Sequence, residues 1–89
     1  MAQHQTDLAE RLVDSGLDSK EARVILTLST GSPLKASEIG TRVGITRMDA
    51  YNTLRRLQDS GLVMATVDKP MRFTGLSIEE IFQHLIHRE

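Results

Sequence analysis

Apolar residues recur at helical spacing in five stretches of the chain, and capping or turn residues bound most of these stretches. The periodicity predicts helices over residues 6–15, from the cap at Asp18 to Leu28, and over 36–43, 47–59 and 78–88. Residues 62–67 and 71–74 are rich in strand formers and flank a turn, which predicts a β-hairpin. The pattern therefore indicates a mainly α fold with a small sheet of two or three strands.

Capping sequences mark the start of three of these helices. An acidic residue stands three positions after the N-cap residue in 18–21, 46–49 and 77–80. In a capping box, the N-cap side chain and the acidic side chain each accept a hydrogen bond from the other residue's amide. Gly44 and Ile45 leave only a tight turn between the third and fourth helices, which predicts a helix-turn-helix. With the hairpin as a wing, we expect a winged helix-turn-helix with flanking N- and C-terminal helices.

The composition is that of one soluble globular domain. The chain has 89 residues, of which 39% are hydrophobic and 26% are charged, and a chain this short builds a single core. We therefore expect one domain over residues 1–89, with no separate sensor or catalytic domain. Cysteine is absent, so neither disulfides nor thiolate zinc sites add to the core. No signal peptide or membrane-spanning stretch is evident, which predicts a cytoplasmic protein.

The net charge of −1 hides an uneven distribution along the chain. Residues 35–72 carry seven basic and four acidic side chains, a net charge of +3, whereas residues 1–34 and 73–89 each carry −2. The positive segment contains the predicted helix-turn-helix and wing. Because local positive charge is needed to meet phosphates, this distribution favours a nucleic-acid-binding surface in the middle of the chain.

The fourth predicted helix has the composition of a DNA-reading helix. With Ala50, Leu54 and Leu57 facing the core, its outer face is polar. In the major groove Asn pairs with adenine, Arg pairs with guanine, and an apolar side chain contacts the thymine methyl group. We therefore expect base contacts from Arg47, Met48, Asn52 and Arg55. We expect contacts with the DNA backbone from Thr46, Tyr51, Arg56, Lys69 and Arg72.

The order and spacing of several short sequence pieces are similar to those of a known family. The pieces are Gly16-Leu17, Glu21-Ala22-Arg23-Val24, Ala36-Ser37-Glu38-Ile39, Arg47, Tyr51, Leu54, Leu57, Gly61-Leu62-Val63, Pro70 and Arg72-Phe73. From Gly16 through Leu76 the chain resembles the N-terminal DNA-binding domain of the TrmB-type archaeal transcriptional regulators. MarR-type repressors share the same order of core elements.

The resemblance implies a winged helix-turn-helix regulator that binds double-stranded DNA as a dimer, with Arg47 and Tyr51 near the DNA. Members of the family often carry a sugar-binding domain after this one. Because the chain stops at Glu89, we expect no sugar-sensing domain in it.

Three residues depart from the family's pattern. Lys35 stands where Thr or Ser often caps a helix, and Asp49 stands where a basic or small residue is usual. We expect Asp49 to serve the capping box of the fourth helix. Asp68 stands where Gly often turns the wing, and its carboxylate would repel phosphates. Asp68 therefore argues against deep insertion of the wing into the minor groove.

The terminal helices carry apolar stripes that predict a homodimer. The expected interface consists of Leu8, Leu12, Ile81, Phe82, Leu85 and Ile86. Two copies joined in this way present their recognition helices to half-sites about 34 Å apart, one turn of DNA. The alternative is that the last helix only closes the core of the monomer.

Catalysis and metal binding find little support in the sequence. No phosphate-binding loop, nucleophile elbow, zinc-protease motif or convincing carboxylate pair is present, so we expect no enzyme and no cofactor. His84 and His87 stand three residues apart, and His4 would be a third ligand. Histidines without an assigned third ligand are more typical of surface groups, so we expect no metal site.

Two other binding functions stay open at the level of sequence. Met64, Val67 and Met71 are more apolar than a solvated wing needs, which indicates either core packing or a partner. The runner-up function is therefore a winged-helix module that docks a protein through the wing and the last helix. A third alternative is a DNA-binding subunit whose sensor lies on another chain.

Overall fold

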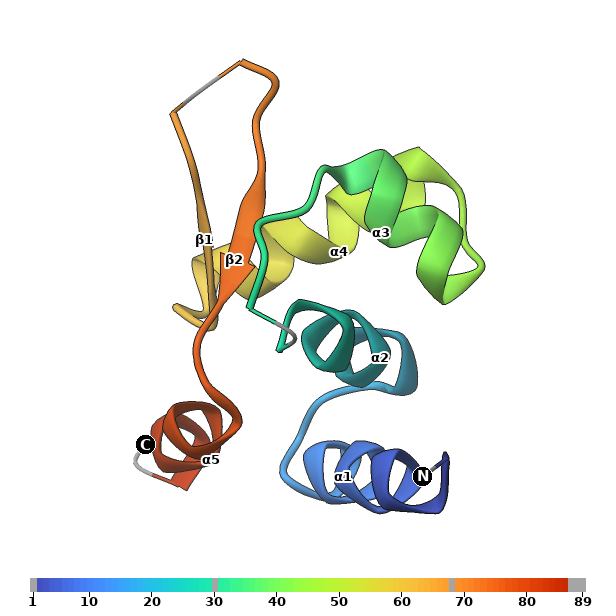
Figure 1. The fold of residues 1–89 in the computed structure, drawn as a ribbon. Helices are drawn as coiled ribbons and strands as arrows, with labels where there is room; N and C mark the ends of the chain where they lie inside the picture. Colours follow the sequence, from blue (N-terminus) through green and yellow to red (C-terminus); the bar gives the residue numbers. More distant parts are fainter. Residues whose placement is uncertain (1, 30, 68, 87–89) are drawn as a thin grey trace.

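A computed structural model describes residues 2–29, 31–67 and 69–86 of the chain, which form five helices and one hairpin (Figure 1). The elements are α1 (Ala2–Asp14), α2 (Ser19–Leu28), α3 (Ala36–Val43), α4 (Arg47–Asp59), β1 (Val63–Ala65), β2 (Phe73–Gly75) and α5 (Ile78–Ile86). The predicted mainly α fold with a winged helix-turn-helix is confirmed. Helix α1 begins at Ala2 rather than at residue 6, and residues 87 and 88 of the last predicted helix lie outside the described residues.

Capping residues fix the start of α2 and α5 as the sequence predicts. The Asp18 carboxylate accepts from the Glu21 amide at 2.7 Å, and the Glu21 carboxylate accepts from the Asp18 amide at 3.0 Å. Ser77 and Glu80 form the same reciprocal pair at 3.1 and 3.0 Å. At α3 only half of a box is present: Glu38 accepts from the amide of Lys35, whose own side chain has no acceptor atom.

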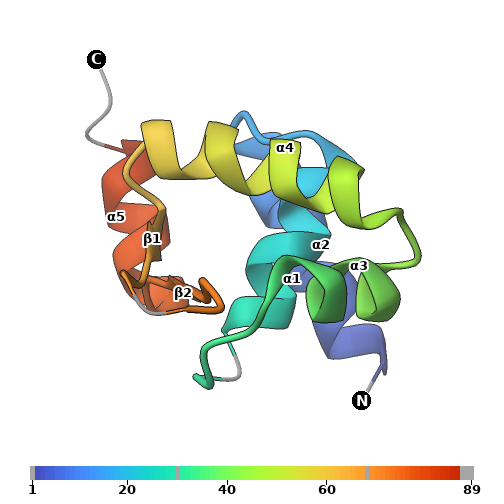
Figure 2. The same cartoon turned by 90° about the horizontal axis from the view of Figure 1, so that it is seen from above.

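The core is built around α2, which packs against α1, α3, α4 and β2. Figure 1 shows α2 between α1 on one side and α3 and α4 on the other, and Figure 2, seen from above, shows α4 along one edge with the hairpin near its C-terminal end. Every helix contributes apolar side chains to this core, among them Leu12, Ile25, Ile39, Leu54 and Ile81, each at most 1% exposed. Thr53 also lies in the core, where its hydroxyl donates to the carbonyl of Asp49 at 2.9 Å. The sequence did not mark Thr53 as a core residue, and the local hydrogen bond explains how a polar side chain is accommodated there.

The turn between α3 and α4 is tight because one carbonyl holds two amides. The carbonyl of Gly40 accepts from Gly44 at 2.8 Å and from Ile45 at 2.9 Å. Gly44 has φ = +87°, a left-handed conformation that glycine adopts without steric strain. The chain therefore leaves α3 and enters α4 within three residues, which fixes the angle between the two helices.

The hairpin is a two-stranded antiparallel sheet with a third segment attached. Met64 pairs with Thr74 at its centre, and Leu34 adds an isolated antiparallel bridge to Phe73. Leu34 and Phe73 exchange two main-chain hydrogen bonds of 3.1 and 2.8 Å. The ordered strands are shorter than the predicted 62–67 and 71–74 segments, although Thr66 still donates its amide to Arg72 beyond β1. Figure 1 shows the hairpin projecting at the end of the molecule opposite α1 and α5.

Candidate nucleic-acid interface

Helix α4 presents one buried face and one exposed polar face. Its buried side chains are those of Ala50, Thr53, Leu54 and Leu57. On the opposite side, Met48 is 60% exposed, and Asn52 and Arg55 are also exposed. Arg47 is exposed in the first turn. The four side chains predicted to contact bases are therefore all accessible from outside.

The N-terminus of α4 is open to solvent and carries a polar cap. The Thr46 hydroxyl oxygen accepts from the Asp49 amide at 3.0 Å, and Thr46 itself is exposed. Its hydroxyl proton can still be donated to an acceptor such as a phosphate oxygen. The first-turn amides and the helix dipole also favour an anion at this position.

Tyr51 and Arg55 form a pair along the outer edge of α4. The guanidinium of Arg55 donates to the Tyr51 hydroxyl at 3.3 Å, and its carbon lies 5.9 Å from the centre of the Tyr51 ring. The hydrogen bond that Arg55 donates to Tyr51, helped by the negative charge of Asp59, raises the pKa of Arg55 above its ordinary value. Tyr51 is half-buried, and its ring meets the ring of Phe73 in β2 edge to face, with centroids 6.4 Å apart.

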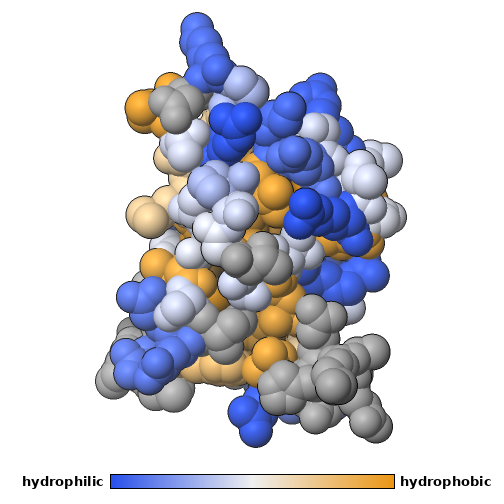
Figure 3. Space-filling model, in the orientation of Figure 1, coloured by the Kyte–Doolittle hydropathy of each residue, from blue (hydrophilic) through white to orange (hydrophobic). Residues whose placement is uncertain are grey.

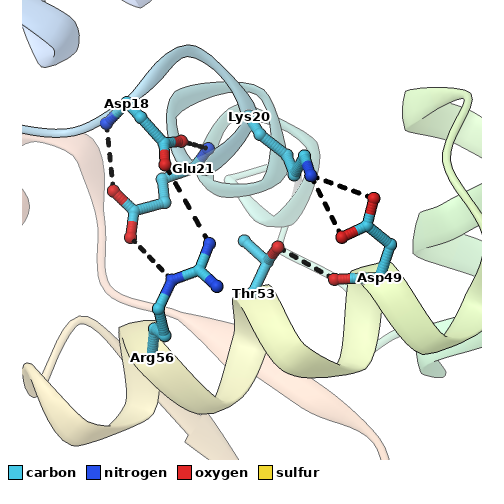
Figure 4. A network of polar contacts seen from close by, with 6 residues as sticks. All are labelled: Asp18, Lys20, Glu21, Asp49, Thr53 and Arg56. Carbon is cyan, nitrogen blue, oxygen red and sulfur yellow. Dashed lines mark hydrogen bonds and ion pairs between the residues drawn. The ribbon is translucent and has the colours of Figure 1, made fainter.

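Arg56 turns away from this pair and toward the N-terminus of α2 (Figure 4). Its guanidinium lies 3.5 Å from a carboxylate oxygen of Glu21 and 3.9 Å from one of Asp18. The predicted contact between Arg56 and the DNA backbone stays a prediction, and a phosphate at this place would also meet two carboxylates. Adjacent arginines in the sequence thus serve two different surfaces.

Asp49 also differs from its prediction. Its carboxylate does not complete the capping box of α4 but binds the ammonium group of Lys20 through both oxygens, at 3.0 and 2.9 Å (Figure 4). The contact joins α2 to the first turn of α4 across 29 positions of sequence. A carboxylate neutralised in this way repels DNA less than a free one, which explains how an acidic residue is tolerated there.

The wing combines positive charge with exposed apolar side chains. Lys69 is exposed and Arg72 is half-buried, and neither forms an ion pair with any described residue. Met64, Val67 and Met71 are 58%, 99% and 42% exposed. Core packing of these three side chains is therefore ruled out. The prediction for Asp68 lies outside the described residues.

Polar and charged side chains predominate on the upper part of the face in Figure 3, over the wing and α3. Arg42, Lys35, Arg47 and Arg55 belong to the helix-turn-helix, and none of the four forms an ion pair with a described carboxylate. By contrast, the positive charges of Lys20 and Arg56 are matched by acidic partners. Most of the described cations without an ion pair therefore lie on α3, α4 and the wing, although Arg11 of α1 and Arg23 of α2 also lack one.

The apolar residues of the terminal helices are mostly used inside the monomer. Leu12 and Ile81 are fully buried and Leu85 is 9% exposed, so the core of the monomer covers them. The predicted dimer interface stays a prediction. Leu8 and Phe82 are half-buried, and the side chain of Ile86 lies outside the described residues. Phe82 borders an open hollow together with Arg11, Asp14 and Ser15.

Within the described part of the chain, no three histidine, cysteine or acidic side chains are grouped closely enough to hold a metal ion. The predictions for the side chains of His4, His84 and His87 lie outside what the structure describes. No described helix is both long and apolar enough to cross a membrane.

A family model for the sugar-specific transcriptional regulator TrmB matches residues 12–79. The match begins in α1 and ends at the start of α5, so it contains the complete helix-turn-helix and the wing. No curated protein sequence is significantly similar to the chain.

Several solved structures share the fold. TrmBL2, an archaeal chromatin protein described as showing a novel mode of DNA binding, superposes with a TM-score of 0.82 at 20% identity. The transcriptional regulator Tm0710 from Thermotoga maritima gives a TM-score of 0.74 at 16% identity. A MarR-family regulator from Silicibacter pomeroyi gives 0.68 at 20% identity.

These superpositions cover 92%, 98% and 97% of the chain in the same order. The chain spans only 33% of the TrmBL2 chain and 65% and 64% of the other two. At these identities, the likeness establishes the winged-helix fold.

Proposed function

The chain belongs to the TrmB family of transcriptional regulators, and from this premise we propose that it regulates transcription by reading the sequence of double-stranded DNA. Helix α4 lies in the major groove, and the wing formed by β1, β2 and their connecting loop lies on the adjacent backbone. The protein acts in the cytoplasm by occupying its site, without a cofactor and without catalysis.

The observation that carries this proposal is the exposed face of α4. Met48 lies on this face in the first turn of the helix. Asn52 and Arg55 follow it about one and two turns further along. An amide, a guanidinium and an apolar thioether are together the groups that distinguish adenine, guanine and thymine in the major groove. Met48 is 60% exposed on this face, so its thioether is accessible to a thymine methyl group.

Each contact has a different task in this proposal. Asn52 reads adenine, Arg47 and Arg55 read guanine, and Met48 contacts a thymine methyl group. Backbone phosphates are held by Thr46, by Lys69 and Arg72 of the wing, and by the amides that open α4. Tyr51 was predicted to contact the backbone, and its hydroxyl proton, which the Arg55 hydrogen bond leaves unused, can be donated to a phosphate.

The test measures binding to a labelled duplex from the region upstream of the protein's own reading frame. Binding is detected by fluorescence anisotropy at several salt concentrations. A scrambled duplex of the same composition is the control. We expect tighter binding to the native duplex and a log–log salt slope of about 0.9 for each phosphate neutralised. Equal affinity for the two duplexes would exclude sequence reading there, and binding to neither at low salt would exclude the proposed function.

Replacement of Asn52 and of Arg72 by alanine is expected to separate base reading from backbone contact. Asn52→Ala loses about 5- to 150-fold affinity for the native duplex, because one bidentate base contact is removed, and little affinity for the scrambled duplex. Arg72→Ala weakens binding to both duplexes equally and lowers the salt slope by about one. If both variants lose affinity equally on both duplexes, this division of tasks is wrong.

We also propose that the protein binds as a homodimer. The interface is the surface of α1 and α5 around the half-buried side chains of Leu8 and Phe82. Two recognition helices one turn of DNA apart then bind paired half-sites. Light scattering after size-exclusion chromatography is expected to give twice the mass of the chain. On DNA, inserting about 5 base pairs between half-sites places one on the opposite face of the duplex and should abolish the gain from pairing. A monomeric mass together with indifference to this insertion would refute the dimer.

A second candidate function is favoured by the exposed apolar side chains of the wing. Val67, Met64 and Met71 offer an apolar surface that a protein partner would cover. The other half of this alternative is weaker than the sequence indicated, because Ile81 and Leu85 of α5 are buried. Two results together would favour this protein-docking function. The wild-type protein would bind neither duplex, and a protein that co-purifies with wild type would not co-purify with Val67→Ser.

A further inference from the structure

We propose that Tyr51 is a positioning residue that holds the guanidinium of Arg55 in place to read a guanine. This inference rests on the proposed function of α4, and it assigns to Tyr51 a task other than its own contact with DNA. Tyr51 acts through Arg55, and Arg55 makes the base contact.

Tyr51 links Arg55 of the same helix to the base of the wing. On one side its hydroxyl accepts from Arg55 at 3.3 Å, with the guanidinium carbon 5.9 Å from the ring centre. On the other side its ring stands at 74° to that of Phe73, which is 1% exposed. Phe73 belongs to β2 and is tied to Leu34 by two main-chain hydrogen bonds. Through Tyr51, the position of an exposed arginine therefore depends on the buried residue Phe73 at the base of the wing.

An exposed arginine on a free helix face samples many rotamers, and fixing it on binding lowers affinity. The Tyr51 hydroxyl and ring restrict this sampling before DNA arrives. The hydrogen bond uses one N–H of the guanidinium, and enough donors remain for both the O6 and N7 acceptors of guanine. The planar, fork-like group thus keeps the geometry that bidentate recognition needs.

The neighbouring Arg56 is held by carboxylates instead of a hydroxyl. Its guanidinium is held by the carboxylates of Glu21 and Asp18, which partly cancel its charge. Arg55 is held by the hydroxyl of Tyr51 and forms no ion pair with a described carboxylate, although the negative charge of Asp59 acts on it, so its positive charge is less cancelled than that of Arg56. A tyrosine orients the guanidinium without the repulsion that an acid would exert on a phosphate.

The experiment compares wild type, Tyr51→Phe, Arg55→Gln and the double variant on the native and scrambled duplexes. Tyr51→Phe keeps the ring against Phe73 and removes only the hydroxyl. We expect it to lose about 2- to 12-fold more affinity for the native duplex than for the scrambled duplex, the effect of one net hydrogen bond, because a contact between Tyr51 and a phosphate would be lost equally on both. In the Arg55→Gln background this excess loss on the native duplex is expected to vanish.

A guanine scan identifies the base that Arg55 reads. Each guanine of the native duplex is replaced in turn by 7-deazaguanine, which lacks the N7 acceptor. One position is expected to weaken wild type but not Arg55→Gln. Arg56→Gln removes the same charge one residue away and is the matched control, which should lose affinity equally on both duplexes and still respond to that position.

The free protein supplies a measurement that does not depend on DNA. The side-chain Nε–H of Arg55, followed by ¹⁵N relaxation, is expected to be more ordered in wild type than in Tyr51→Phe, with unchanged melting temperatures. Equal order in both proteins, or equal losses from Tyr51→Phe with and without Arg55, would overturn this inference. If wild type binds neither duplex, the proposed function fails instead, and the relaxation result still decides whether Tyr51 positions Arg55.

Discussion

Replacement of Phe73 by alanine is expected to lower the free energy of unfolding by about 3–5 kcal/mol. Phe73 is 1% exposed, and its main chain carries the two hydrogen bonds that attach Leu34 to β2. Its removal leaves a cavity where the wing meets the helices and removes the ring against which Tyr51 packs. Small domains are stable by about 5–15 kcal/mol, so this one change removes a large part of the total. Urea unfolding followed by circular dichroism measures the effect.

Met64→Ala is the matched control for this prediction. Met64 lies in the paired strand β1 but is 58% exposed, so the loss is expected to stay within about 0.5 kcal/mol. Phe73→Leu adds a milder variant that keeps most of the volume but loses the edge-to-face contact with Tyr51. If Phe73→Ala is no more destabilising than Met64→Ala, Phe73 is not the residue that anchors the wing to the helices.

Features that depend on near neighbours in the sequence were predictable. The capping boxes of α2 and α5 form as expected because both partners lie three residues apart and need no other element. The outer face of α4 followed from helical periodicity for the same reason. At Asp49, however, Lys20 of α2 competes for the carboxylate and wins, since two charge-assisted hydrogen bonds outweigh one contact with an amide.

Features that depend on which element packs where were not predictable. Arg55 and Arg56 are indistinguishable by type, and only the position of α2 beside α4 turns Arg56 toward Glu21. The same limit applies to the terminal helices. Periodicity shows that Leu12 and Ile81 form apolar stripes but does not show what covers them, and the monomer's own core does so.

Gly40 is a residue whose importance sequence reasoning missed, although a signal was present. A glycine inside a helix destabilises it by about 1 kcal/mol relative to alanine, so its presence in α3 calls for a packing reason. The reason is the turn into α4. A Cβ at Gly40 would lie 2.9 Å from the carbonyl oxygen of Ile45 and 3.2 Å from that of Thr46, and both are backbone atoms that no rotamer change can move.

Gly40→Ala is therefore expected to destabilise the protein by about 2 kcal/mol, because the steric cost of overpacking exceeds the gain in helix propensity. Thr46 is the N-cap of α4, so relief of the contact must shift the start of the recognition helix. Urea unfolding measures the stability, and anisotropy with the native and scrambled duplexes measures the shift. We expect a loss of preference for the native duplex that persists at temperatures where the variant is fully folded.

Ser37→Ala separates the steric effect from helix propensity. Ser37 is exposed in the same helix, so alanine there gains propensity without a contact and should change stability by no more than about 0.5 kcal/mol. The sign of the Gly40→Ala result is decisive, because propensity alone would make that variant more stable than wild type. A stabilised variant with unchanged DNA preference would mean that Gly40 does not set the position of α4.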